Sequence, residues 1–129
     1  MSRAAVLPPA AGEDGVVEFV VETVAAGAVN ACPPVTVGVG IGGDLELAAI
    51  TAKRALLRPV GEPSADERLA RLEGRALDRI NQLGIGPGGF GGRTTALAVH
   101  ADAVPCHIAS LPVAVVLECH AHRHGRIEL

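Results

Sequence analysis

Two glycine-rich segments restrict what this chain can fold into. One covers residues 38–43 (GVGIGG) and the other covers residues 84–92 (GIGPGGFGG). Glycines at this density indicate tight turns, and their missing side chains let neighbouring elements approach closely. The chain has two phenylalanines and no tryptophan or tyrosine, so Val, Leu, Ile and Ala have to fill the core. Its 129 residues suit one domain with one core.

The apolar patterns predict a mixed α/β fold, a single domain in which helices pack on a mixed sheet. The predicted helices cover residues 15–27, 44–57 and 65–83, and the predicted strands cover residues 35–39, 94–100 and 112–119. An irregular lead-in is expected over residues 1–14 and a polar tail over residues 120–129. Asp44 is expected to cap the second helix, and Ser64 with Glu67 is expected to form a capping box for the third. The charges of the third helix are expected on a solvated face.

Composition excludes two classes of partner. The formal net charge is −3, and no basic stripe with stacking aromatics exists, so a nucleic-acid-binding protein is not expected. No apolar run reaches the roughly 18–20 residues that a membrane helix needs, and the start does not have the pattern of a signal peptide. A cytoplasmic location is therefore expected, where cysteines remain thiols or bind metals rather than form disulfides.

The first glycine segment satisfies the G-x-G-x-x-G fingerprint of dinucleotide-binding sites between a predicted strand and a predicted helix. That fingerprint also requires a second parallel strand that ends in an acidic residue about 20 residues later. Residues 57–63 stand there and are predicted to form a loop. Three interpretations remain: a glycine turn for close helix–strand packing, a nucleotide site, or a glycine wall around another anionic group. The first is favoured.

Three histidines near the end of the chain alternate, at His120, His122 and His124. Alternate residues of an extended segment share one face, so these side chains could converge on a zinc ion. A second group of ligands at zinc-finger spacing is missing, which favours solvated side chains instead.

Four segments in combination carry a more specific signal. They are residues 32–43 (CPPVTVGVGIGG), 52–58 (AKRALLR), 81–97 (NQLGIGPGGFGGRTTAL) and 107–123, which contains HIASLPVAV and CHAHR. In this order they resemble the α subunits of class I, iron–sulfur-dependent hydro-lyases, the fumarate hydratases and L(+)-tartrate dehydratases. The resemblance runs from about Leu7 to the end of the chain. It implies that residues 1–129 form part of an α catalytic domain, roughly its second half, and an incomplete enzyme.

The resemblance implies a [4Fe–4S] cluster held by three cysteines, with one open iron that binds the substrate. Cys32 and Cys119 correspond to two of the ligands, and the third is expected outside this chain. His107 corresponds to a histidine that faces the substrate. Cys106 stands where the family commonly has threonine and is not expected to bind the cluster. Arg93 is expected either to pair with a substrate carboxylate or to form a surface or inter-subunit ion pair.

The implied reaction is the reversible addition or removal of water at a small dicarboxylic acid. It would be either the hydration of fumarate to malate or the dehydration of tartrate to oxaloacetate. The implied partners are an N-terminal α segment and a β subunit or domain, joined in an oligomer. Arg123 has the same two interpretations as Arg93. Val116 stands where an asparagine is common in the family, and this replacement would remove a polar contact. Two alternatives stay open: a nucleotide-binding module, and a truncated remnant without catalytic activity.

Overall fold

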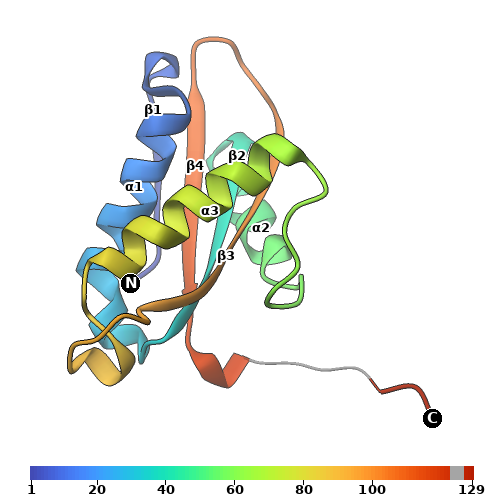
Figure 1. Ribbon diagram of the computed structural model, residues 1–129. Helices are drawn as coiled ribbons and strands as arrows, with labels where there is room; N and C mark the ends of the chain where they lie inside the picture. Colours follow the sequence, from blue (N-terminus) through green and yellow to red (C-terminus); the bar gives the residue numbers. More distant parts are fainter. Residues whose placement is uncertain (123–126) are drawn as a thin grey trace.

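A mixed sheet organises the structure, a computed structural model that describes residues 1–122 and 127–129. The strands of this described part are β1 (Arg3–Leu7), β2 (Val35–Gly43), β3 (Ala96–Cys106) and β4 (Leu111–Glu118). Their order across the sheet is β1-β4-β2-β3 (Figure 1). Strand β4 is antiparallel to both β1 and β2, whereas β3 is parallel to β2. The predicted mixed α/β fold is therefore confirmed.

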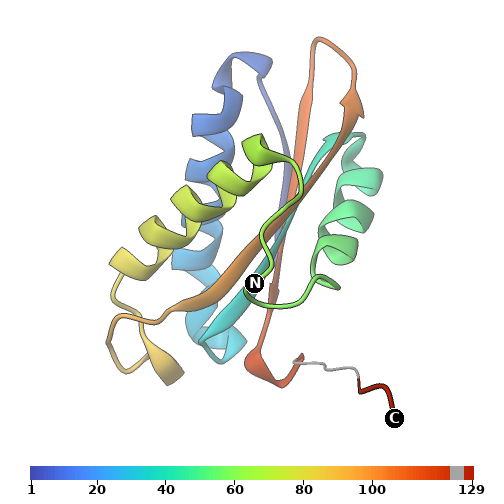
Figure 2. The same ribbon diagram turned by 45° about the vertical axis from the view of Figure 1, so that its right-hand side comes forward.

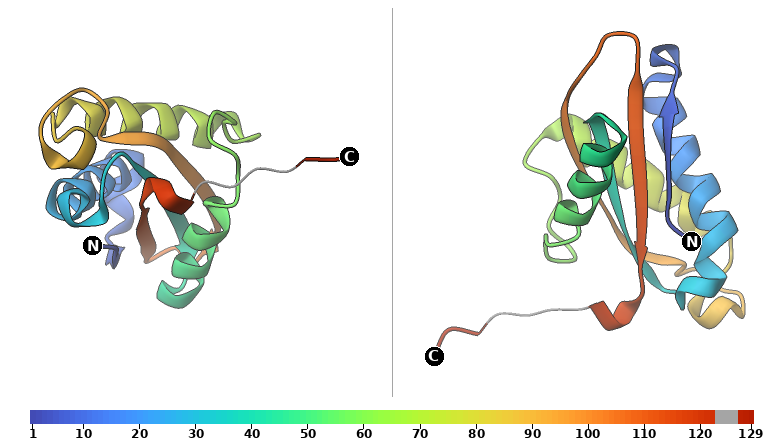
Figure 3. Two further views of the ribbon diagram at one scale, coloured as in Figure 1. Left: turned by 90° about the horizontal axis from the view of Figure 1, so that it is seen from below. Right: turned by 180° about the vertical axis from the view of Figure 1, so that it is seen from behind.

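Helices cover both faces of the sheet. Helices α1 (Gly12–Gly27) and α3 (Glu67–Gln82) lie on one face, and α2 (Leu45–Ala55) lies on the other (Figure 2). The views from below and behind show the same three layers (Figure 3). The connection from β2 to β3 passes first through α2 and then through α3, so it visits both faces.

The main core lies between the sheet and the pair α1 and α3. Val35, Val37 and Val39 alternate along β2 and are completely buried on this face. Valines of α1 and β4 meet them, as expected for a core without large aromatic side chains. Phe19 of α1 is the exception, and the guanidinium of Arg3 lies 5.0 Å from the centre of its ring.

The glycines of the first segment lie inside β2 and not in a turn. A Cβ atom on Gly40 would lie 2.0 Å from the carbonyl oxygen of Ala48, and one on Gly38 would lie 2.3 Å from that of Ala52. Both contacts are with the backbone of α2, so only glycine lets this helix approach the strand so closely. The favoured interpretation, close helix–strand packing, explains the spacing without a nucleotide.

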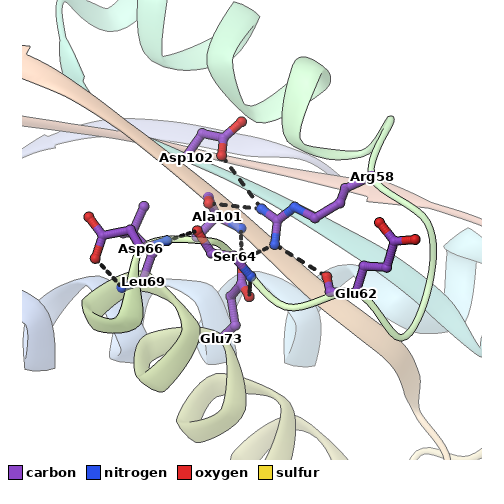
Figure 4. Close-up of polar contacts among 8 residues, drawn as sticks. All are labelled: Arg58, Glu62, Ser64, Asp66, Leu69, Glu73, Ala101 and Asp102. Atoms are coloured by element: carbon purple, nitrogen blue, oxygen red, sulfur yellow. Dashed lines mark hydrogen bonds and ion pairs between the residues drawn. The ribbon is translucent and has the colours of Figure 1, made fainter.

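On the side of β3 that faces away from β2, side chains form hydrogen bonds with the backbone of the strand (Figure 4). The Glu73 carboxylate accepts from the Ala101 N–H at 2.7 Å, and the Arg58 guanidinium donates to the Ala101 carbonyl at 3.1 Å. Arg58 also donates to Glu73 at 2.7 Å, and the second carboxylate oxygen of Glu73 accepts from the Ser64 N–H at 3.0 Å. Glu73 is buried, so the expectation that the charges of this helix are solvated is wrong for this residue.

Asn81 plays the same role at the start of β3. Its side-chain oxygen accepts from the N–H groups of Thr95 and Ala96, and its amide donates to the Ala96 carbonyl. One face of α3 therefore replaces the neighbouring strand that β3 does not have on this side.

The helix ends follow local signals in part. Asp44 accepts from the Leu47 N–H at 2.7 Å, so its predicted capping role is confirmed. The predicted capping box is wrong, because Asp66 caps α3 by accepting from the N–H groups of Arg68 and Leu69.

The predicted irregular lead-in is also wrong, since each of residues 3–7 pairs with a residue of β4. A five-residue edge strand depends on its partner, which local patterns do not reveal.

The contact between β2 and α2 predicts opposite outcomes for two glycine-to-alanine changes. We expect Gly40→Ala to lower the free energy of unfolding by about 3 kcal/mol, because the new methyl group must displace the backbone of α2. Gly74→Ala is the matched control, because a Cβ at this exposed helical position meets nothing within 4 Å. It should raise the free energy by about 0.5–1 kcal/mol through helix propensity. Urea denaturation followed by circular dichroism measures both, and equal effects would contradict the packing argument.

The edge contacts predict a second pair of outcomes. Glu73→Gln should lower the free energy of unfolding by about 3 kcal/mol, because an amide cannot accept at both positions and leaves Arg58 only its longer ion pair with Asp102 at 3.5 Å. Glu67→Gln changes a side chain that is 94% exposed and should shift the value by less than about 0.5 kcal/mol. The same denaturation experiment compares them. A Glu73 variant as stable as the Glu67 variant would show that the buried contacts contribute little.

Candidate functional site

Two of the predicted site residues lie at the same end of the sheet. Cys32 precedes β2 and Cys119 follows β4. Because these strands are antiparallel, with Thr36 opposite Glu118, the start of one meets the end of the other. We call this end the cysteine end and define it by Cys32, Cys119 and the second glycine segment. It lies at the bottom of Figure 1.

Each of the two cysteines adjoins a short 3-10 turn at the cysteine end. Cys32 follows a 3-10 turn (Ala28–Ala31) and has a φ of +54°, a left-handed conformation that few residues other than glycine adopt. Its side chain is exposed, whereas Cys119 is half-buried and leads into a second 3-10 turn (His120–His122). Backbone strain of this kind is frequent at functional sites. Both cysteines are free thiols that could bind a metal.

The second glycine segment forms a loop beside Cys32. The Gly88 N–H donates to the Pro33 carbonyl at 2.8 Å, which ties the loop to the cysteine segment. The loop also closes on itself, because the Gly91 N–H donates to the Ile85 carbonyl at 2.8 Å. Arg93 follows the loop and is exposed. The cysteine end therefore carries two thiols, a glycine-rich loop and, directly after that loop, an exposed arginine.

His107 lies at the other end, in the turn between β3 and β4 (top of Figure 1). The eight residues of β4 separate this turn from Cys119 by about 26 Å at the usual rise of a strand. Cys106, the last residue of β3, borders the same turn, and its thiol donates to the Ser110 carbonyl at 3.2 Å. The structure therefore brings His107 together with Cys106 but not with Cys32 or Cys119.

A pocket of about 390 Å³ adjoins this turn. The first turns of α1 and α3 form its opposite wall, where Arg68 donates to the Glu13 carboxylate. This hydrogen bond raises the pKa of the Arg68 guanidinium further, so it stays a cation. His107 is exposed at the rim, and its Nδ1 accepts from the Ala109 N–H at 3.1 Å. Its Nε2 therefore remains available for hydrogen bonding.

The histidines proposed as zinc ligands are only partly covered by the structure. His120 is exposed, whereas His124 and Arg123 lie outside the described residues. Within residues 1–122 and 127–129, no three His, Cys, Asp or Glu side chains converge as metal ligands. Cys32 and Cys119 by themselves could supply two thiolate ligands to a metal.

His100 is a buried titratable residue that the sequence did not single out. It lies in β3 opposite Gly38, is 2% exposed, and its Nδ1 has no hydrogen-bond partner. Burial lowers its pKa, and the nearby Arg58 guanidinium lowers it further, while the carboxylates of Glu73, Asp102 and Glu62 offset only part of this lowering. Its position inside an apolar strand segment was the only signal available.

Comparisons with known proteins agree with one another. Residues 1–128 match a family model described as Fumarate hydratase (Fumerase). A Methanocaldococcus jannaschii protein, named provisionally as an L(+)-tartrate dehydratase subunit alpha, is 46% identical over the whole chain. The L(+)-tartrate dehydratase subunits alpha of Escherichia coli strains K12 and UTI89 are 44% and 43% identical over 97% and 98% of the chain. The chain spans only 46%, 41% and 42% of the lengths of these three relatives.

Helices of the described residues are all too short or too polar to cross a membrane.

The buried His100 predicts a pH dependence of stability. Its folded pKa lies below the ordinary value of about 6.5, so the unfolded chain binds the proton more readily. The free energy of unfolding should therefore fall as the pH decreases below about 6.5 and level off below the folded pKa. His100→Gln should remove this part of the slope. Urea denaturation between about pH 5 and pH 8 tests the prediction, and identical slopes for both proteins would contradict it.

Proposed function

The chain belongs to the fumarate hydratase (Fumerase) family, and we propose that it forms part of the α subunit of an iron–sulfur-dependent hydro-lyase. The proposed reaction is the reversible addition of water to a small dicarboxylic acid, with fumarate and tartrate as the candidate substrates. The observation that carries the proposal is that Cys32 and Cys119, which are 87 positions apart in the chain, lie at the same end of the sheet. A family match over the whole chain supports it.

We propose that Cys32 and Cys119 hold two irons of a [4Fe–4S] cluster. Thiolates are the usual ligands of such clusters, and Cys32 and Cys119 are free thiols at the same end of the sheet. When bound, the cluster would supply an open iron as a Lewis acid for the substrate hydroxyl. We propose that the third thiolate comes from outside residues 1–129, because Cys106 lies at the opposite end of β4.

Arg93 is the proposed carboxylate partner at the cysteine end. A planar guanidinium pairs with a carboxylate through two hydrogen bonds, and this one is exposed beside the glycine loop. A second carboxylate of the substrate would need a further cation from the parts that this chain does not contain.

The proposed role of His107 requires a second chain. A small dicarboxylate bound at the cysteine end cannot reach a side chain about 26 Å away in the same chain. His107 would therefore donate a hydrogen bond or a proton in a site that its turn completes on another copy or subunit. Histidine suits this work near neutral pH.

The relatives named subunit alpha support an assembly with at least one other subunit type, which we propose for this chain as well. We place the protein in the cytoplasm, where reducing conditions keep these three thiols free. The nucleotide alternative has lost its support, because Gly38 and Gly40 contact a helix from inside a strand. A remnant without activity would keep the same fold and differ only in metal binding.

A grafted subunit tests the cysteine assignment. This chain replaces the matched region of the E. coli K12 relative, and the product is expressed anaerobically with the other subunit of that enzyme. We expect bound iron and iron–sulfur absorbance, and we expect Cys32→Ser or Cys119→Ser to abolish both because two thiolates hold a cluster poorly. Cys106→Ser is the matched control and should retain the iron. Unchanged iron content in the first two variants would refute the assignment.

A further inference from the structure

We propose that Phe90 anchors the remaining part of the α subunit, the polypeptide that supplies the third cluster ligand, on the cysteine end of this chain. The inference rests on the proposed function, because that function is what requires a third ligand at this end. It goes further by naming the contact surface and its central side chain.

Phe90 projects from the tip of the second glycine segment. Its side chain is 96% exposed, whereas Phe19, the other aromatic residue of the chain, is buried in the core. Val29 is 57% exposed, and a Cβ on Gly89, the residue before Phe90, would lie 3.3 Å from it. Val29 therefore lies beside the loop residue that precedes Phe90, and we call the exposed side chains of Phe90 and Val29 the apolar patch. This patch adjoins Cys32, because Val29 lies in the 3-10 turn that Cys32 follows.

The loop holds Phe90 in a fixed position despite its six glycines. The Gly86 N–H donates to the Thr95 hydroxyl, the Gly89 N–H to the Gly86 carbonyl, and the Phe90 N–H to the Pro87 carbonyl. The bonds from Gly88 to Pro33 and from Gly91 to Ile85 add further constraints. A preorganised loop loses little conformational freedom on binding, and rigid aromatic side chains are the residues on which interfaces most often depend.

The polypeptide that would cover the apolar patch can be inferred from the third cluster ligand, which the cysteine end does not supply. Two thiolates are present there, and the only other cysteine of the chain lies at the opposite end of the sheet. The relatives carry more than half of their length outside the matched region. A segment that places a third thiolate beside Cys32 has to pass over the neighbouring surface, and Phe90 with Val29 forms the exposed apolar patch on that surface.

A single tryptophan reports on this contact, because the chain contains none. Phe90→Trp is prepared in the isolated chain and in the grafted subunit, and the spectrum of the unsubstituted protein is subtracted. We expect emission at long wavelength and strong acrylamide quenching in the isolated chain. In the grafted subunit we expect a shift to shorter wavelength and loss of quenching. Val60→Trp is the matched control, since Val60 is 52% exposed in the loop between α2 and α3, and it should stay quenchable in both proteins.

A tryptophan at position 90 that is quenched equally in both proteins would overturn the proposal. Iron content separates this failure from a failure of the proposed function. A grafted subunit that binds iron through Cys32 and Cys119 while the introduced tryptophan stays exposed keeps the function and loses the anchor. Phe90→Ser provides a second measurement, because this side chain projects into solvent and its removal should leave the fold intact. It should lower the iron retained by the grafted subunit, whereas Val60→Ser should not.

Discussion

The backbone contact between β2 and α2 is the constraint on which the rest of the structure depends. Gly38 and Gly40 let the helix lie directly on one face of the strand, so the opposite face can be filled entirely by valines. A strand buried on both faces has to be central, with β4 and β3 as its neighbours. Strand β4 runs antiparallel to this central strand, which brings the segments that carry Cys32 and Cys119 to the same end of the sheet.

Local signals in the sequence were sufficient for part of this fold. The alternating valines of residues 35–39, the period of α3 and the cap at Asp44 depend only on neighbours in the chain, and all three were predicted correctly. Strand β1 could not be predicted, because its five residues become a strand only by pairing with β4. Glu73 has the spacing of any surface charge on a helix. Its burial follows from the position of β3, which no local pattern contains.

The candidate site shows the same division. The residue types that bind an iron–sulfur cluster were recognised through the resemblance. Neither spacing nor periodicity indicates that Cys32 and Cys119 lie at the same end of the sheet. Their proximity depends on an antiparallel pairing between strands separated by two helices and a third strand. The placement of His107 far from both cysteines depends on the same pairing. A family motif names residues that act together, and only the topology shows which of them one chain can bring together.

The side chains that hydrogen-bond to the outer edge of β3 also affect how the chain behaves toward other copies of itself in solution. An unpaired edge strand is a template on which other chains can add strands, and this process leads to sheet growth and aggregation. Here a carboxylate, a guanidinium and a carboxamide occupy hydrogen-bonding positions of that edge. The chain can therefore expose Phe90 and Val29 to solvent while the edge of β3 stays closed to strand addition.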